Sequence, residues 1–214
     1  MGDLLQFLSK QEMDSMRTDV RELVLSFDSA LYGTRPTLPI TFIYRKLLTQ
    51  TVDVSSGVVS TTWDNKRING YGGHIAIHDM ELNKDKLEIG DQFILFDVSQ
   101  IDSPPKDDDR VLLFVTYKGT VSLDNGSAVI QGLDTEFLKE GVQGGDVLID
   151  CDITGNVVEI ASVQSDTQLT LRSNWTGSDI PYAKYEIFRS HNIIDSKIDP
   201  ILALTRLGLR RAGS

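Results

Sequence analysis

Along most of the chain, apolar and polar residues alternate with a period of two, the pattern of a β-strand that buries one face. The pattern is most regular between residues 119 and 172. Short alternating segments there cover residues 120–123, 127–131, 147–149, 157–160 and 168–171. Asn-Gly, Gly-Gly-Asp and Gly-Asn sequences between them favour tight turns. We therefore expect a compact all-β module, which we place at residues 119–183.

One stretch near the N-terminus has helical spacing instead. Ser9 and Glu12 form a capping box that marks a helix start, and Gly33 and Pro36 would end the helix. The apolar residues between them recur every three or four positions: Met13, Met16, Val20, Leu23, Val24 and Phe27. This pattern predicts an amphipathic helix within a helical segment of residues 1–35. Its apolar face would cover the chain's own β domain or, as the alternative, a partner.

Further alternating segments lie on both sides of the module, at residues 40–45, 58–63, 87–96, 111–115 and 182–188. We expect residues 36–118 and 184–205 to form one small β-barrel. The module would interrupt it at a hairpin tip, where insertions are best tolerated. The expected fold is thus mainly β, with an N-terminal helix, a barrel, an inserted module and a basic C-terminal tail at residues 206–214. Residues 200–211, which are apolar with a basic end, read either as a last strand or as an extended arm that pairs with a neighbouring subunit's sheet edge.

Residues 64–73 are rich in Asn and Gly and are predicted to form a long loop. Lys66, Arg67 and Tyr71 lie in this stretch. A loop of this length in a compact domain is usually functional or mobile. We expect it to contact a neighbouring subunit or to project into a channel.

The net charge of −10 is unevenly distributed. Residues 119–183 contain ten acidic residues against Lys139 and Arg172, whereas residues 189–214 contain five bases against two acids. An acidic module argues against nucleic-acid binding through that part of the chain. The single cysteine, Cys151, excludes an internal disulfide and fits assembly in a reducing cytoplasm. We expect neither a signal peptide nor a membrane span.

No residue pattern spells out a catalytic, cofactor or metal site, so we expect a protein that is not an enzyme. His74 and His78 on one strand would lie about 13 Å apart, too far to share one ion. The acidic run at residues 107–109 lacks the alternating ligands and the distal Glu of a calcium loop. A nucleophile–base set or a carboxylate pair is not evident.

The module contains an ordered set of residues that resembles a small β module of tailed-bacteriophage virion proteins. The matching segments are Gly119-Thr120-Val121, Gly126-Ser127, Thr135-Glu136-Phe137, Gly141-Val142-x-x-Gly145-Asp146-x-Leu148 and Ser165-Asp166-Thr167-x-Leu169-Thr170-Leu171. The rest of the chain is similar to the head-completion, or stopper, proteins of long-tailed phages. The stretches that carry this second resemblance are residues 20–27, 40–45, 90–96 and 185–201.

The resemblance implies a structural virion protein of the head–tail connector, or neck. It would form a ring of six or twelve copies below the portal, join head to tail, and retain or gate packaged DNA. The implied partners are a portal or adaptor protein, a tail terminator or tail tube protein, and packaged DNA in transient contact. Assembly in the host cytoplasm and a final place in the virion follow, with no cofactor and no membrane contact.

Within this interpretation, Lys66, Arg67 and Tyr71 are the candidate residues facing the lumen and DNA. Candidate contacts with other subunits or the portal come from both ends of the chain: Met16, Val20, Leu23, Phe27, Leu204, Arg206, Leu207, Arg210 and Arg211. The alternative is a tail-completion, tail-tip or fibre protein. It would bind a receptor or glycan through the module, with Trp175 and Tyr182 as stacking aromatics.

Overall fold

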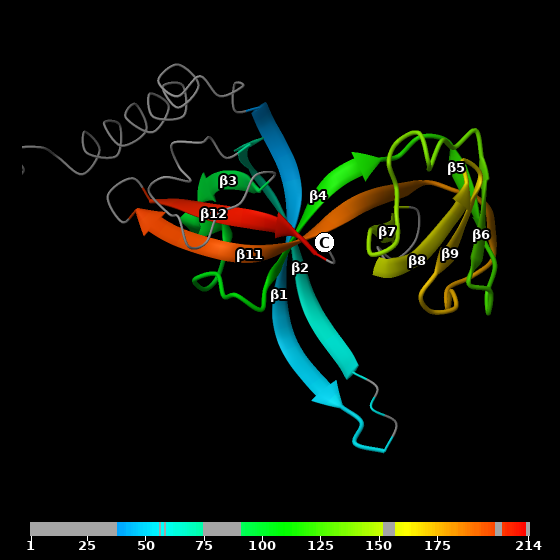
Figure 1. The fold of residues 1–214 in the computed structure, drawn as a ribbon, viewed down its shortest axis with the longest axis horizontal. Coiled ribbons are helices and arrows are strands. Elements are labelled where there is room, and N and C mark those ends of the chain that lie inside the picture. The colour runs from blue at the N-terminus through cyan, green and yellow to red at the C-terminus, as the bar shows by residue number, and fades with distance from the viewer. Residues whose placement is uncertain are drawn as a thin grey trace, which may run out of the picture. The chain divides into compact units, whose positions relative to one another are not determined.

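The computed structural model describes residues 38–55, 57, 59–74, 91–151, 157–199 and 203–212. These residues are mainly β, as predicted (Figure 1). The strands are β1 (Leu38–Val52), β2 (Val59–His74), β3 (Gln92–Asp97), β4 (Arg110–Thr116), β5 (Thr120–Leu123), β6 (Val129–Leu133), β7 (Val147–Asp150), β8 (Val157–Ser165), β9 (Gln168–Leu171), β10 (Ile180–Ala183), β11 (Tyr185–Asp199) and β12 (Leu204–Arg211). A short 3-10 turn, η2 (Val98–Gln100), follows β3. The predicted N-terminal helix lies outside the described residues.

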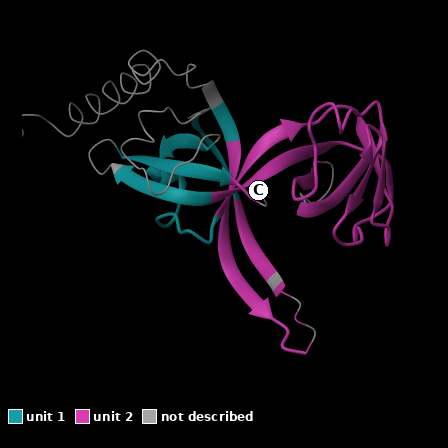
Figure 2. Cartoon of the chain, in the orientation of Figure 1, with its two compact units in different colours: residues 1–41, 66–109, 193–210 teal, residues 42–65, 110–192, 211–214 magenta. Residues whose placement is uncertain are grey.

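Hydrogen bonding orders the strands β10-β5-β6-β9-β8-β7-β11-β12-β3-β2-β1-β4, with a further pairing between β11 and β4. The chain divides into two compact units (Figure 2). Unit 1 comprises residues 1–41, 66–109 and 193–210, and unit 2 comprises residues 42–65, 110–192 and 211–214. The barrel and the domain boundaries drawn from the sequence stay predictions.

In unit 1, β3 is paired on both sides. Its residues pair with Leu204–Leu209 of β12 and with Gly70–His74 of β2, both antiparallel. Alternation along these strands buries one set of side chains. The buried set comprises Ile68, Phe93, Ile94, Phe96, Leu207 and Leu209.

The predicted loop at residues 64–73 is wrong, because these residues belong to the continuous strand β2. The glycines that favoured a loop have a packing role in the sheet. A Cβ on Gly72 would lie 2.6 Å from Cδ1 of Ile40, so the glycine leaves room for this side chain. Ile68, surrounded by polar residues in the sequence, is 1% exposed and belongs to the core.

Of the two interpretations of residues 200–211, the last strand is confirmed by β12, which covers residues 204–211. The predicted basic tail at residues 206–214 mostly belongs to this strand, and Leu207 and Leu209 are fully buried. Apolar residues at alternate positions therefore outweighed the three arginines, whose side chains are half-buried at the strand surface.

In unit 2, β11 lies between two strands. Residues 187–192 pair with β4, and residues 185–188 pair with β7. A cluster of buried residues forms around these pairings: Ile43, Leu112, Val147, Ile149 and Phe188. β4 in turn pairs with β1 through Arg110–Leu113 and Phe42–Arg45.

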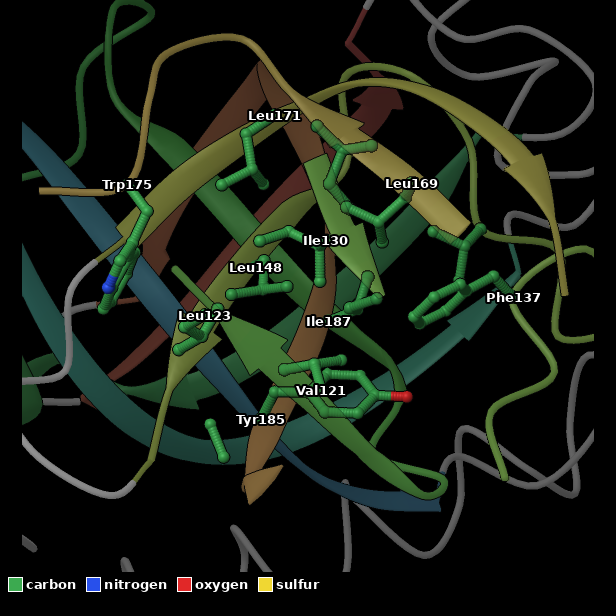
Figure 3. Close-up of a cluster of buried hydrophobic side chains, with 13 residues drawn as sticks. Val121, Leu123, Ile130, Phe137, Leu148, Leu169, Leu171, Trp175, Tyr185 and Ile187 are labelled. Atoms are coloured by element: carbon green, nitrogen blue, oxygen red, sulfur yellow. The ribbon is translucent and has the colours of Figure 1, made fainter. Parts of the chain in front are cut away.

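The predicted module corresponds to β5 through β10, and all five strands expected between residues 119 and 172 are present as β5–β9. Their side chains converge on one core, shown in Figure 3. The fully or almost fully buried members include Val121, Leu123, Ile130, Phe137, Leu148, Ile160, Leu169, Leu171 and Trp175. Tyr185 and Ile187 of β11 complete this core, so the module shares its packing with a strand outside the predicted boundary.

Candidate interaction surfaces

The predicted DNA-facing residues lie on β2 and not on one loop. Lys66 and Arg67 are adjacent in a strand, so their side chains point to opposite faces. Nζ of Lys66 lies 3.3 Å from Oδ1 of Asp102, and the two side chains are 42% and 75% exposed. Arg67 is exposed and Tyr71 is half-buried. The structure therefore does not bring Lys66, Arg67 and Tyr71 together as one site.

Arg45, a basic residue of β1, is held in place by contacts within the chain. Its guanidinium carbon lies 4.8 Å from the ring centroid of Trp63, and Nε donates to Oδ1 of Asn65 at 2.9 Å. Burial lowers the pKa of Arg45 to about 10, with Glu159 opposing and Arg110 adding to the shift. The guanidinium stays charged at neutral pH, but it is held by an aromatic face and an amide within the chain.

The predicted contacts at the C-terminal end are largely taken up within unit 1. Leu204 and Leu207 are 5% and 0% exposed, so these two side chains pack in the chain's own core. The guanidinium of Arg206 lies over the ring of Phe93 at 5.3 Å. Arg210 forms an ion pair with the buried Asp91. Arg211 is half-buried, and Met16, Val20, Leu23 and Phe27 lie outside the described residues.

Two ion pairs have the same geometry, in which an arginine donates two hydrogen bonds to a buried aspartate. Arg210 donates from Nε and Nη2 to the two oxygens of Asp91 at 3.1 and 2.9 Å. Arg189 donates from Nε and Nη2 to those of Asp146 at 3.1 and 3.2 Å. Each aspartate follows a glycine and comes directly before a strand, β3 or β7. The recurrence of Gly-Asp at residues 90–91 and 145–146 was visible in the sequence, but its arginine partners were not.

Two lysines partly neutralise the acidic residues of the module. Lys118 bonds with Glu136, and Lys139 lies 3.4 Å from Glu136 and 3.9 Å from Asp166. The hydrogen bond from Lys118 is the main reason that the pKa of Glu136 is lowered. Other acids of the module are exposed: Asp124, Asp134, Glu140 and Asp179. The module therefore presents a net negative surface to solvent.

Exposed apolar side chains gather in two places that the sequence did not single out. Leu48, Val52, Val54 and Val59 lie on the hairpin of β1 and β2 and are 51–96% exposed. Phe114 and Tyr117, at and just after the end of β4, are 45% and 69% exposed, with ring centroids 5.7 Å apart. Exposed apolar groups of this kind mark interaction surfaces.

Trp175, expected to stack on a sugar in the alternative interpretation, belongs to the core. It is 2% exposed, and its Nε1 donates to the carbonyl oxygen of Ser178 at 3.0 Å. Tyr182 remains exposed. The indole can be buried without an unsatisfied donor because its one polar atom bonds inside the chain.

We next consider metal ligands, the cysteine and membrane-spanning helices among the described residues. Among them, no group of three or more His, Cys, Asp or Glu side chains could hold a metal ion. Cys151 lies in an exposed turn after β7. The part of the chain with assigned structure also contains no helix long and apolar enough to cross a membrane.

Comparison with known proteins adds no family: no protein-family model and no curated protein sequence matches this chain.

Proposed function

We propose that this protein is a non-enzymatic structural component of the head–tail connector of a tailed bacteriophage. Identical copies would form a ring below the portal, join the head to the tail, and retain or gate the packaged DNA. Its work would be performed by interfaces with a portal or adaptor and a tail terminator or tube. A reacting centre is not part of the proposal.

The observation that carries the proposal is the role of the residues through which the module resembles phage virion proteins. Their glycines, Gly119, Gly126, Gly141 and Gly145, all have positive φ, between 73° and 88°. Their apolar residues are all buried: Val121, Phe137, Val142, Leu148, Leu169 and Leu171. The resemblance therefore includes turn glycines and core residues that determine this fold.

Asp166, another of the residues that carry the resemblance, forms hydrogen bonds that hold two turns together. Its side chain accepts from the backbone N–H groups of Leu138 and Lys139 at 3.0 and 3.1 Å. Its carbonyl oxygen accepts from the Thr135 hydroxyl at 2.7 Å. These bonds fix the turn at residues 137–141 against the β8–β9 turn, which supports an evolved module over a chance pattern of strands.

Strand pairing supports the small β-barrel that the proposal needs. The series β11-β12-β3-β2-β1-β4 has both of its ends joined, since β4 pairs with β11. A series of antiparallel strands whose first and last members pair is the arrangement that a barrel requires.

The charge distribution supports a channel role. A negative module would repel the phosphate backbone and keep DNA from binding to a channel wall during ejection. Among the three predicted DNA-facing residues, Arg67 is exposed whereas Lys66 and Tyr71 are half-buried, so Arg67 would supply the contact with resting DNA. A single base gives a weak contact, which suits DNA that has to leave.

The test is whether the chain forms closed rings. The purified full-length protein, alone and mixed with portal rings, would be imaged by negative-stain electron microscopy. Closed rings of uniform diameter, and density for the chain between portal and tail in images of intact particles, are the expected results. The absence of rings under both conditions would refute the proposal.

The alternative, a receptor- or glycan-binding tail protein, loses one of its two stacking residues because Trp175 is buried. Tyr182 alone gives a small contact surface. A trimeric mass together with binding to host cells would favour this alternative over the connector.

A further inference from the structure

Beyond Arg45, the hairpin of β1 and β2 continues as a two-stranded ribbon, residues 46–52 and 59–65, which we call the β1–β2 ribbon. The register of β1 with β4 ends at Arg45, and that of β2 with β3 covers only Gly70–His74. Figure 1 shows these parts of the two strands side by side, leading to the turn. None of the ribbon's described side chains is buried. Since an isolated two-stranded hairpin is at best marginally stable in water, a covering surface would stabilise the ribbon.

The chemistry of the ribbon favours a protein over DNA as that surface. Leu48, Val52, Val54 and Val59 are 54%, 57%, 96% and 51% exposed. The only charged residue between residues 47 and 63 is Asp53. Binding to a phosphate backbone requires basic residues, which this stretch does not contain.

The same chain exposes a second apolar surface, formed by Phe114 and Tyr117, which we call the aromatic patch. Phe114 is held in place by an edge-to-face contact with the buried Phe188, at a ring-centroid distance of 5.8 Å. At this point β4 is paired on one side only: its register with β1 ends at Leu113, whereas its register with β11 continues to Thr116. In the described part of the chain, the patch therefore lies beside an open strand edge, which can accept an added strand.

Composition favours the same pairing of surfaces. The ribbon and its turn, residues 46–65, contain one base and two acids, and Asp53 is the only charged residue near the tip. The core of a protein–protein interface is poor in charged residues and rich in aromatic ones, as in a contact between this ribbon and the aromatic patch.

We propose that the β1–β2 ribbon of one copy docks on the aromatic patch and the open β4 edge of a second copy of this chain. Val52, Val54 and Val59 would cover the two rings, and backbone groups of the ribbon would pair with the β4 edge. The contact joins two unlike surfaces, so it repeats head to tail and closes into a ring when the rotation permits. This inference rests on the proposed function, since the occupant is a neighbouring copy.

The experiment compares two disruptive substitutions with two matched controls. Val54→Asp alters the ribbon and Tyr117→Asp alters the patch, whereas Val129→Asp and Tyr182→Asp change exposed residues of the same types elsewhere in unit 2. Mass photometry and sedimentation velocity would follow assembly of the full chain, alone and with portal rings. Either disruptive variant should weaken self-association by about tenfold or more, as loss of a central contact residue does. The controls should assemble like the unaltered chain.

Mixing identifies the contact directly. A mixture of the Val54→Asp and Tyr117→Asp variants retains one intact ribbon and one intact patch, so it should form one-to-one dimers that neither variant forms alone. Loss of assembly with Val54→Asp but not with Tyr117→Asp would mean ribbon-to-ribbon pairing and would overturn the inference.

Failure of the inference is distinguishable from failure of the proposed function. Rings that form normally with both disruptive variants would overturn the ribbon contact and leave the connector proposal standing. A chain that stays monomeric, alone and with portal rings, would overturn both.

Discussion

Arg189 and Asp146 form a two-bonded ion pair in which the carboxylate is almost completely buried. The distances are 3.1 Å from Nε to Oδ1 and 3.2 Å from Nη2 to Oδ2, and the Asp146 side chain is 2% exposed. Nη2 also donates to the carbonyl oxygen of Gly141, and Asp146 accepts from the backbone N–H of Gln143. One arginine of β11 therefore fastens the turn that leads into β7.

Replacement of this arginine should be strongly destabilising. Arg189→Met leaves the Asp146 carboxylate buried without its counter-charge, which costs about 3–5 kcal/mol of unfolding free energy. Urea unfolding followed by circular dichroism measures the change. Arg172→Met is the control, since Arg172 is an exposed partner of Glu159 and its loss should cost less than about 1 kcal/mol. Equal effects of the two substitutions would contradict the assigned role of the buried pair.

The Arg210–Asp91 pair should act in the same way within unit 1. Arg210→Met is expected to reduce hydrogen-exchange protection in β3 and β12, the two strands that this pair joins. Protection of β7–β9, which pack around the separate core of the module, should change much less. Mass spectrometry of exchanged peptides gives both values from one sample. A uniform loss of protection across all strands would show that the two units unfold together.

His191 should make stability depend on pH. Burial lowers the pKa of this imidazole, as do Arg189 and Arg211, whereas a backbone bond to Arg189 and the Asp146 carboxylate oppose the shift. The unfolded state therefore binds the proton more tightly, and folding stability falls as pH drops below about 6.5, the ordinary histidine value. The loss continues until pH reaches the lowered pKa of the folded state.

The measurement is the difference between the unaltered chain and His191→Asn. Unfolding free energies at several pH values between 7.5 and 5 should converge as pH falls, because only the chain with His191 loses stability through this group. NMR titration of the imidazole resonance that the substitution removes gives the pKa itself. A value at or above about 6.5 would contradict the prediction.

Gly119 should be irreplaceable. Its φ is +81°, and a Cβ would lie 2.4 Å from the carbonyl oxygen of Leu133 and 2.7 Å from the carbonyl carbon of Asp134. Gly119→Ala therefore adds a backbone clash to the conformational strain, and we expect a loss above about 2 kcal/mol. Gly126→Ala is the matched control: its φ is +80° with open space around the Cβ position. The control should lose only about 1 kcal/mol, and thermal unfolding of both variants tests the difference.

The strands of the module could be predicted from the sequence because each depends on local information. Alternation along Thr120–Leu123 and Gln168–Leu171 selects one buried face, and Asn125-Gly126 allows the turn that joins β5 to β6. The same method was wrong at residues 64–73. Gly70 and Gly72 favour turns in isolation, but their pairing with Phe96 and Ile94 of β3 is a tertiary contact. The candidate interaction surfaces could not be predicted from the sequence either, because the exposure of Val54 and Tyr117 depends on which residues pack beside them in the folded chain.

The sequence alone determined that this protein is mainly β, that its middle is a compact acidic module, and where most of that module's strands lie. These properties are local: a period of two and a turn glycine act within a few residues. Only the tertiary structure decided that β11 lies between β4 and β7, that Trp175 is buried, and that Asp91 and Asp146 each bond with an arginine. Such pairings join residues tens of positions apart, and the free energy that selects them comes from burial and charge compensation, which require the folded chain.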